Sequence, residues 1–581
     1  MPDKVIVTNL TALKQKYGAA GLKKIQSALK DLIAADKKRG LTSTLVALDD
    51  GAAMKKLKAP PVKDADSTRE NKKAIDGVYK ALVPDYLMIL GAIDVVPHQD
   101  LKNPLFSTDP DGDDERFADS DLPYACDAPY SQNIKDFTGP TRVVGRLPDL
   151  TGAQGSPEYL LGVLKTAAKW KSLERSDYEK YLGISADKWR ESTSESLNNI
   201  FNSDKDLQNS PTKGFKWTPG LINRRVHFIN CHGGDTLPDF FGQSDTDDDD
   251  MPVSHRAVFV GRKNSIVEGT IVAAECCYGA QLYDPSAEDD GQMGMCNTYL
   301  DKKAYGFFGS SNTAYGPSTG NDQADLVCQY FIQRVLAGAS TGRAALEARL
   351  RFVEKASPLS PMNRKTLAQF NLFGDPAIVP VDKATSKLVG GPKLRNLTRG
   401  VKPLGAAKSA STAKAIQQAG AAQRAQRRDT LRAKGAMLLH LQPSMSKSKA
   451  GPPNKVEASL RKMMVQLNCK PGGAISFKVG PAPSPASATK GAMAKGITRT
   501  LAAKKHGTTA FHVMFGKPAT VPTATRSTAK TKGIRGMAKG ASAKAAADKD
   551  IGHKSRLRNY VVLEAKEVDG KIVEVTEAHS K

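Results

Sequence analysis

The sequence predicts an α/β protein in which a mostly parallel sheet is followed by a basic linker and a small, β-rich C-terminal domain. Apolar strands alternate with amphipathic helices from the N-terminus on, which is typical of parallel sheets with right-handed crossovers. Large apolar residues then become rare, and apolar alternation returns only near the C-terminus. These changes divide the 581 residues into three parts, 1–382, 383–455 and 456–581.

The first part begins with a β-α-β-α-β pattern. Strands are expected at 5–8, 44–48 and 86–91, with helices over 22–35 and 72–82 between them. The last of these strands is apolar throughout, as a strand buried on both faces would be. The pattern predicts that the parallel sheet starts at the N-terminus.

The middle of the first part continues with a helix over 157–173 and a polar, helix-compatible insertion that extends to residue 222. This insertion shows no candidate chemistry, and its tryptophans are expected to be packing residues. The remaining elements of the body are expected to be a strand at 304–312, helices at 325–337 and 342–354, and a closing strand at 370–379.

The charge of the chain is divided unevenly. Residues 383–581 contain 39 Lys and Arg against 9 Asp and Glu, which gives them a net charge of +30, whereas residues 1–382 carry −5. A basic tail of this kind predicts one of three roles: nonspecific binding of nucleic acid or an anionic surface, a solvated linker, or a region of Lys and Arg sites for self-cleavage. Aromatic residues are almost absent between 382 and 510, so base stacking is not expected.

Within the tail, residues 383–455 have too few large apolar side chains to fold alone, and they are expected to be a linker with one transient helix. Val568-Asp-Gly-Lys571 is typical of a hairpin turn. Lys- and Ala-rich inserts are expected at 481–506 and 523–550. Strands of the small domain are expected at 460–465, 474–479, 508–515 and 560–575.

Seven cysteines, without a C-x-x-C pair, argue against a disulfide framework and a zinc ribbon, so a reducing compartment is expected. The N-terminus lacks the apolar region of a signal peptide, and no run of 18 apolar residues occurs. The sequence therefore predicts a cytoplasmic protein without a transmembrane segment.

Two apolar runs end in reactive residues followed by glycine: one leads to His232 and Gly233, the other to Cys276 and Cys277. Residues just past the carboxyl ends of parallel strands face the ligand crevice, so His232 and a cysteine are expected to meet there. A cysteine peptidase needs this pair, because the imidazole takes the thiol proton and later gives it to the leaving amine. The amides of Gly233 and of the nucleophile would form the oxyanion hole.

The residues alone leave alternatives open. Successive side chains of an extended segment point to opposite sides, so only one of the two adjacent cysteines can attack. Buried free cysteines are common, so a structural role is a second interpretation. A zinc site from Cys231, His232, Cys276 and Cys277 is a third, although adjacent ligands on a strand diverge.

An acidic loop, Asp109–Asp114, is similar to an oxygen cage for Ca²⁺, but it lacks the EF-hand spacing and the closing Glu. Two interpretations of this loop therefore stay open: it binds a calcium ion, or it is a solvated acidic loop. The peptidase hypothesis itself requires no cofactor.

Four motifs in this order resemble those of the gingipain-type cysteine peptidases, a family of the caspase-like clan. They are Ser120–Tyr124, Val143–Pro148, the His-Gly and Cys-x-x-Gly pair, and Asn371–Pro376. The resemblance implies a caspase/hemoglobinase-like α/β/α sandwich over residues 1–382 and a cysteine endopeptidase of protein or peptide substrates. The C-x-x-G spacing of this clan favours Cys276 as nucleophile, with Cys277, which begins the C-x-G of caspases proper, as the alternative.

Gingipains select Arg or Lys before the scissile bond through an acidic residue ahead of the V-G-R-L-P strand. The resemblance implies Asp136 for this role, with Asp121 as second choice and a solvated loop carboxylate as the alternative for either. Gingipains are secreted with a prodomain, whereas this chain shows neither a signal peptide nor an obvious propeptide. A second hypothesis is a caspase-like scaffold without turnover whose basic tail binds nucleic acid or a protein partner.

Overall fold

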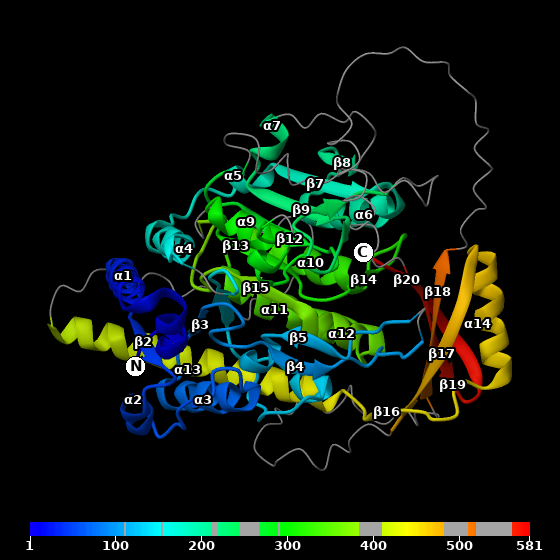
Figure 1. Ribbon diagram of the computed structural model, residues 1–581, viewed down its shortest axis with the longest axis horizontal. Coiled ribbons are helices and arrows are strands. Elements are labelled where there is room, and N and C mark those ends of the chain that lie inside the picture. Colours follow the sequence, from blue (N-terminus) through cyan, green and yellow to red (C-terminus); the bar gives the residue numbers. More distant parts are fainter. Residues whose placement is uncertain are drawn as a thin grey trace.

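In the described part of the chain, ten strands form a sheet through the centre of the protein (Figure 1). They are β1 (Lys4–Thr8), β2 (Ser43–Ala47), β3 (Tyr86–Leu90), β6 (Val144–Leu147), β7 (Tyr181–Ala186), β8 (Leu207–Ser210), β9 (Val226–Asn230), β12 (Ile271–Ala274), β13 (Gly306–Ser310) and β15 (Phe370–Phe373). Their order is β2-β1-β3-β6-β15-β13-β12-β9-β7-β8. Neighbours are parallel except β13 and β15, which are antiparallel. Two parallel halves thus meet at this pair and run in opposite directions.

The computed structural model describes residues 1–109, 112–152, 155–210, 219–243, 266–288, 291–382, 410–480, 509–518 and 560–581. The predicted inserts at 481–506 and 523–550 lie outside the described residues. Among the described residues, no helix combines the length and the apolar character that crossing a membrane requires.

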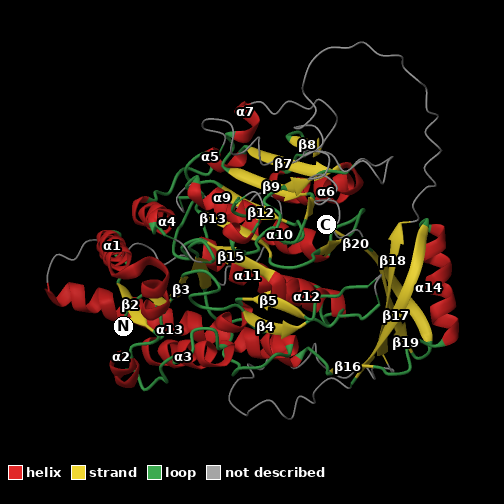
Figure 2. Ribbon diagram, in the orientation of Figure 1, coloured by secondary structure: helices red, strands yellow, loops and turns green. Residues whose placement is uncertain are grey.

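Helices cover both faces of the sheet (Figure 2). The alternation along β13 shows the two faces: Phe307 packs against Tyr299, with ring centroids 5.5 Å apart, while Phe308 stacks on Phe331 at 4.7 Å. Tyr299 belongs to α9 and Phe331 to α10, so the predicted α/β/α sandwich is confirmed. The helices of the body are α1 (Leu10–Lys38), α2 (Gly51–Lys56), α3 (Thr68–Leu82), α4 (Glu158–Lys169), α5 (Ser176–Glu179), α6 (Arg190–Phe201), α7 (Pro219–Ile222), α9 (Met295–Asp301), α10 (Gln323–Leu336), α11 (Thr341–Lys355) and α12 (Pro361–Gln369).

The N-terminal β-α-β-α-β pattern is confirmed by β1, β2 and β3 with α1 and α3 between them. The interpretation of residues up to 222 as a helical insertion is wrong, because β7 and β8 add two strands to the sheet there. β8 (Leu-Gln-Asn-Ser) is the last strand on its edge. An edge strand can carry polar residues, which removes the apolar pattern that would have revealed it.

The motifs that carry the family resemblance form buried ion pairs. Arg146 donates to Asp121 at 2.6 Å, which joins the V-G-R-L-P and S-D-L-P-Y segments. Asp375 of N-L-F-G-D-P accepts from the Lys4 ammonium at 2.6 Å. All four side chains are buried, so these motif residues hold the first half of the sheet together.

A second sheet lies beside the body and is antiparallel, in the order β14-β20-β19-β18-β17-β16 (Figure 1). Its first strand belongs to the body, and the five others confirm the predicted β-rich C-terminal domain. The predicted hairpin is confirmed, with φ of 52° at Asp569 and 76° at Gly570. The strands are β14 (Tyr315–Gly316), β16 (Met445–Lys447), β17 (Cys469–Val479), β18 (Thr509–Pro518), β19 (Val561–Val568) and β20 (Lys571–Ser580), and four short strands pair elsewhere, β4 (Gln99–Lys102) with β5 (Phe117–Ser120) and β10 (His232–Gly233) with β11 (Phe240–Phe241).

The prediction of a strand at 460–465 is wrong, because these residues belong to helix α14 (Asn454–Gln466). Its buried residues Val456, Leu460 and Met464 recur every four positions, which is the period of a helix face. The short window that suggested a strand contained only one turn of this pattern.

The predicted linker contains a long helix, α13 (Ala410–His440). Its leucines Leu431 and Leu438 lie two turns apart and are buried in the same apolar cluster as α11. Lys434, between them, pairs with Glu354 of α11 at 3.0 Å. The C-terminal half of this helix therefore packs against the body through its leucines.

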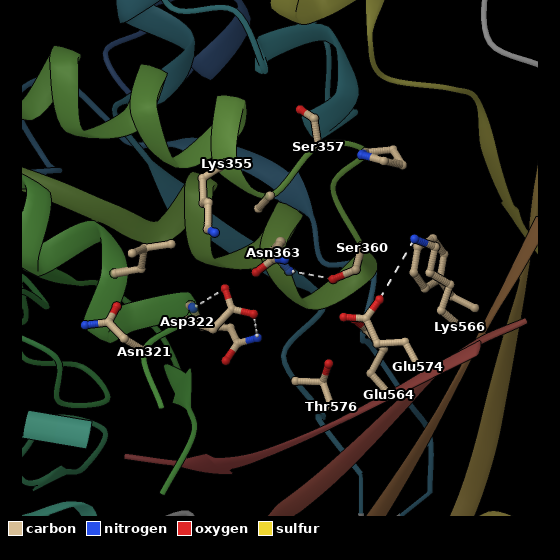
Figure 3. A pocket seen from close by; sticks show the side chains of 15 residues that line it. Asn321, Asp322, Lys355, Ser357, Ser360, Asn363, Glu564, Lys566, Glu574 and Thr576 are labelled. Atoms are coloured by element: carbon tan, nitrogen blue, oxygen red, sulfur yellow. Dashed lines mark hydrogen bonds and ion pairs between the residues drawn. The ribbon is translucent and has the colours of Figure 1, made fainter. Parts of the chain in front are cut away.

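A pocket of about 340 Å³ lies between the body and the C-terminal sheet (Figure 3). Glu564 of β19 lines it and is buried, and its carboxylate accepts from the Met362 amide at 3.2 Å. Burial raises the pKa of Glu564 to about 7. The other charged groups of the pocket are Asp322, which caps α10, Lys355 of α11, Lys566 of β19 and Glu574 of β20.

We expect Glu564→Gln to stabilise the protein at pH 8 by about 2–3 kcal/mol and to change nothing at pH 4. A pKa raised above the ordinary 4.5 means that the stabilising contribution of Glu564 is complete below pH 4.5 and is lost as the pH rises through 7. Glutamine keeps the acceptor for Met362 without the charge. Denaturant unfolding of both proteins from pH 4 to pH 8 measures the difference, and parallel curves at every pH would contradict the prediction.

Candidate active site

The two motif segments end at the same edge of the sheet. β9 and β12 are parallel neighbours, with Val226 opposite Ile271 and Ile229 opposite Ala274. β10 follows β9 directly and consists of His232 and Gly233. The structure thus brings His232 to the edge where Cys276 and Cys277 follow β12, and all three side chains are buried.

Gly233 lies against the cysteine segment. A Cβ atom at this position would lie 1.8 Å from the main-chain oxygen of Cys277 and 3.3 Å from the Cβ of Cys276. No side chain fits at that distance, so only glycine allows the two segments to approach this closely.

His232 is held by two contacts. Its Nε2–H donates to the amide oxygen of Gln243 at 2.8 Å, and its ring packs edge-on against Trp189, with centroids 4.5 Å apart. Nδ1 is buried without a hydrogen-bond partner in the described part of the chain. Burial lowers the pKa of His232 to about 4, so the ring is neutral at pH 7. A neutral ring whose Nε2 carries the proton has a free lone pair on Nδ1, as a general base requires.

The two cysteines lie on opposite faces of the sheet end. Cys276 belongs to the apolar cluster of α9, and its thiol lies 3.9 Å from the main-chain oxygen of Ile229. Cys277 belongs to the cluster of α10, and its sulfur accepts from the Ala314 amide at 3.2 Å. Burial raises the pKa of both thiols, to about 12 for Cys277.

Two carboxylates form an acidic pocket beside Cys277. Glu275 directly follows β12, and Asp325 lies in the first turn of α10. The Lys581 ammonium lies between them, 2.7 Å from Glu275 and 2.6 Å from Asp325, and the three side chains are fully buried. The same ammonium lies 5.7 Å from the ring centroid of Trp189. Burial raises the pKa of Glu275 well above its ordinary value, with Asp325 adding to the shift and Lys581 opposing it.

The last residues of the sequence cross the site as an extended strand. The end of β20 pairs antiparallel with β14, with Ser580 opposite Tyr315. The Lys581 amide donates to the Ala314 oxygen at 3.0 Å, and the Cys277 amide donates to the Lys581 oxygen at 2.6 Å. The strand therefore places the lysine side chain in the acidic pocket and its main-chain oxygen on the amide of a cysteine.

Gly316 of β14 forms one wall of this pocket. A Cβ atom there would lie 2.2 Å from Cε of Lys581 and 2.5 Å from Oδ2 of Asp325. The glycine thus leaves the space that the lysine side chain fills.

The structure does not bring Asp136 or Asp121 to this pocket. Asp136 lies in a 3₁₀ helix (Ile134–Phe137) and accepts from the Ser131 hydroxyl at 2.6 Å. Asp121 is paired with Arg146 of β6, and β6 runs opposite to β12, so its carboxyl end lies at the other edge of the sheet. Burial disfavours the Asp121 carboxylate, but Arg146 offsets this and lowers its pKa.

Several residues of the site were missed at the sequence level: Glu275, Asp325, Trp189, Gln243 and Lys581. Glu275 had a detectable signal, because an acidic residue in an apolar strand end is unusual and it stands two positions before Cys277, on the same side of an extended segment. Asp325 was expected only as the start of a helix. Nothing in the sequence relates Lys581 to residues about 300 positions earlier.

The carboxylates in and next to the acidic loop 109–114 form ion pairs and hydrogen bonds within the protein. Lys365 pairs with Asp113 and, at 2.6 Å, with Glu115, and the Gly473 amide donates to Asp109 at 2.7 Å. Across the described ranges, no group of three or more His, Cys, Asp or Glu could hold a metal ion. The calcium hypothesis stays a prediction, since residues 110–111 lie outside the described part of the loop.

Comparison with known proteins gives a family for the central part of the chain. Residues 239–381 match the model of peptidase family C25, the gingipain family, and this segment contains both cysteines, Glu275, β14 and Asp325. No curated protein matches the chain significantly.

Two solved structures are similar at low sequence identity. One, described as "Structure of Protease", has 15% identity and a TM-score of 0.41 and covers 65% of this chain and 78% of its own. The other, the Saccharomyces cerevisiae separase-securin complex, has 11% identity and a TM-score of 0.22, with 41% of this chain and 14% of its own covered. At these scores neither carries an argument about function. Residues 239–381 thus match the gingipain family of peptidases, and the family resemblance predicted from the motifs is confirmed.

Proposed function

We propose that the protein is a cysteine endopeptidase that hydrolyses peptide bonds after lysine, with Cys277 as nucleophile and His232 as general base. One observation carries this proposal: Lys581 lies with its ammonium between Glu275 and Asp325 and with its main-chain oxygen on the Cys277 amide. A substrate lysine bound in the same way would present its carbonyl carbon to the Cys277 thiol.

The reaction follows from these positions. Nδ1 of His232 takes the thiol proton of Cys277 while the sulfur attacks the carbonyl carbon of the substrate. The Cys277 amide stabilises the oxyanion, as does the Gly233 amide in this proposal. His232 returns the proton to the leaving amine, which breaks the peptide bond and leaves a thioester on Cys277. A water molecule, deprotonated by His232, hydrolyses the thioester and releases the new carboxylate and the free thiol.

The choice of Cys277 over Cys276 rests on the side of the sheet to which each thiol points. The Cys277 thiol contacts Ala314, the residue whose oxygen accepts from the Lys581 amide. The Cys276 thiol faces the apolar cluster of α9. The oxyanion contact from the Cys277 amide gives the same answer, since a nucleophile commonly contributes its own amide to the hole.

The arrangement of the two carboxylates favours lysine over arginine as the residue before the scissile bond. The pocket offers two carboxylates on either side of one nitrogen, which suits a compact ammonium, whereas a guanidinium prefers one carboxylate in a bidentate contact. Arginine is the second candidate for this position.

A panel of fluorogenic peptides with Lys, Arg, Asp or Leu before the reporter tests the proposal. It is applied to the wild-type chain and to Lys581→Met, which removes the ammonium already in the pocket. We expect cleavage after Lys to exceed cleavage after Leu or Asp by about 100-fold, because a buried carboxylate pair discriminates strongly against a neutral side chain. The His232→Ala variant should lose this activity. No His232-dependent cleavage in either chain would reject the proposal.

Binding of nucleic acid and self-cleavage through the basic tail stay predictions. Of the 39 Lys and Arg in residues 383–581, 22 lie in 383–409, 481–508 and 519–559, outside the described residues.

A further inference from the structure

We propose that residues 577–581, the end of β20 and the lysine after it, act in cis as an inhibitor that occupies the substrate cleft of the same chain. This inference rests on the proposed function, because it takes the cleft to be the peptidase's own. It assigns a regulatory role to the C-terminal sheet, from which this tail extends into the body (Figure 1).

The tail makes the main-chain contacts that an extended peptide would make. A peptide that binds a sheet edge adds a strand to it through main-chain hydrogen bonds. β14 is such an edge, and the tail pairs with it through His579 and Ser580, opposite Gly316 and Tyr315. A substrate cannot form these bonds with β14 while the tail holds them.

The tail also fills the specificity pocket. Lys581 is fully buried, and its ammonium contacts both carboxylates of the pocket, Glu275 and Asp325. Without this cation, two carboxylates would face each other in a buried site, which is strongly unfavourable. The pocket therefore holds Lys581 firmly until another cation replaces it.

The reactive groups are covered in this state. The Cys277 amide is already bonded to Lys581, and the side chains of Cys277 and His232 are almost completely buried. A peptide must displace the tail before its carbonyl reaches the thiol.

The tail can leave without loss of the C-terminal sheet. β19 and β20 pair along their whole length, and the contact of Glu564 with the Met362 amide holds this hairpin on the body independently of the tail. The amide of Ser580 donates to Tyr560 at 2.9 Å, the last contact of the hairpin before the cleft. Release of residues 579–581 breaks few contacts of the hairpin, whereas it opens the whole cleft.

The test compares three chains with a fluorogenic lysine peptide. Lys581→Met keeps a similar stem without the charge and should raise kcat/KM about 10-fold or more. Lys581→Arg keeps a cation and should stay close to the wild type. Lys571→Met is the matched control: it removes an exposed lysine at the other end of β20 and should change nothing. Equal activity of the wild type and Lys581→Met, with both folded by circular dichroism, would overturn the inference and leave the proposed function standing.

A binding measurement keeps the inference testable without turnover. The labelled peptide Glu-Ala-His-Ser-Lys, which copies residues 577–581, is titrated by fluorescence anisotropy onto chains that carry Cys277→Ala. It should bind at least about 10-fold more tightly when Lys581→Met is added, and the same peptide ending in Met should not bind. This binding, combined with an absence of cleavage by the chains that keep Cys277, would support the tail as cleft ligand and reject the proposed catalysis. Equal binding to both chains would reject the inference.

Discussion

Cys277→Ala is expected to lower kcat/KM for a lysine peptide by about 1,000-fold or more, whereas Cys276→Ala should cost less than about 10-fold. Both are made in the Lys581→Met chain so that the tail does not mask the difference. Cys277 lies on the α10 face with Glu275 and the tail, and Cys276 packs against the α9 face. Loss of Cys276 should affect packing only, by removing a small buried side chain.

Alkylation of the thiols distinguishes the two positions independently of turnover. A chloromethyl ketone with a lysine side chain should modify Cys277 and leave Cys276 unmodified, as peptide mass mapping would show. Modification of Cys276 with retention of activity in Cys277→Ala would reverse the assignment and restore the order that C-x-x-G spacing suggests.

Glu275→Gln and Asp325→Asn, tested singly in the Lys581→Met chain, are expected to lower kcat/KM for the lysine peptide by about 100-fold or more. Breaking a buried ion pair costs about 3–5 kcal/mol, and each 1.4 kcal/mol is a factor of ten. The leucine peptide should be unaffected or cleaved slightly faster, because a less charged pocket is easier to fill with an apolar side chain. Initial rates with both peptides give the ratio.

Asp136→Asn is the matched control for this pair. Asp136 is the acidic residue that the family resemblance implies for the pocket, yet its carboxylate bonds to Ser131 in a 3₁₀ helix. The variant should keep the preference for lysine. Loss of that preference in Asp136→Asn, with the preference intact in Glu275→Gln, would show that the pocket lies elsewhere.

Much of the fold was predictable because burial leaves a local pattern. β1, β2 and β3 are short apolar runs separated by amphipathic helices, and each pattern is complete within a few residues. β7 and β8 were not predicted. Gly183 and Ser185 interrupt the apolar pattern of β7, and β8 is a polar edge strand. The helix α14 was mistaken for a strand because one helical turn and a short alternation are alike in a six-residue window.

Only the residues of the site that belong to a sequence motif could be predicted. His232, Gly233 and the two cysteines stand at strand ends that the sequence marks with glycine. The proposed choice of Cys277 depends on which face of the sheet each thiol lies on, and the sequence does not give this. Alternation along the strand puts Glu275 and Cys277 on the same face, but this becomes informative only once Glu275 is known to bind a cation. Asp325 and Lys581 reach the site through tertiary and domain packing, which no local pattern encodes.

The strand pairing between β14 and β20 makes the tail a ligand that is always present at a fixed local concentration. A tethered ligand of this kind acts at an effective concentration in the millimolar range, whatever the amount of protein. Under the proposed inhibition, dilution would not activate the enzyme, and a free peptide would have to compete with that tethered copy for every turnover. Weak or scarce substrates would be excluded, and only a peptide that binds the cleft more tightly than Glu-Ala-His-Ser-Lys, or an abundant one, would be cut.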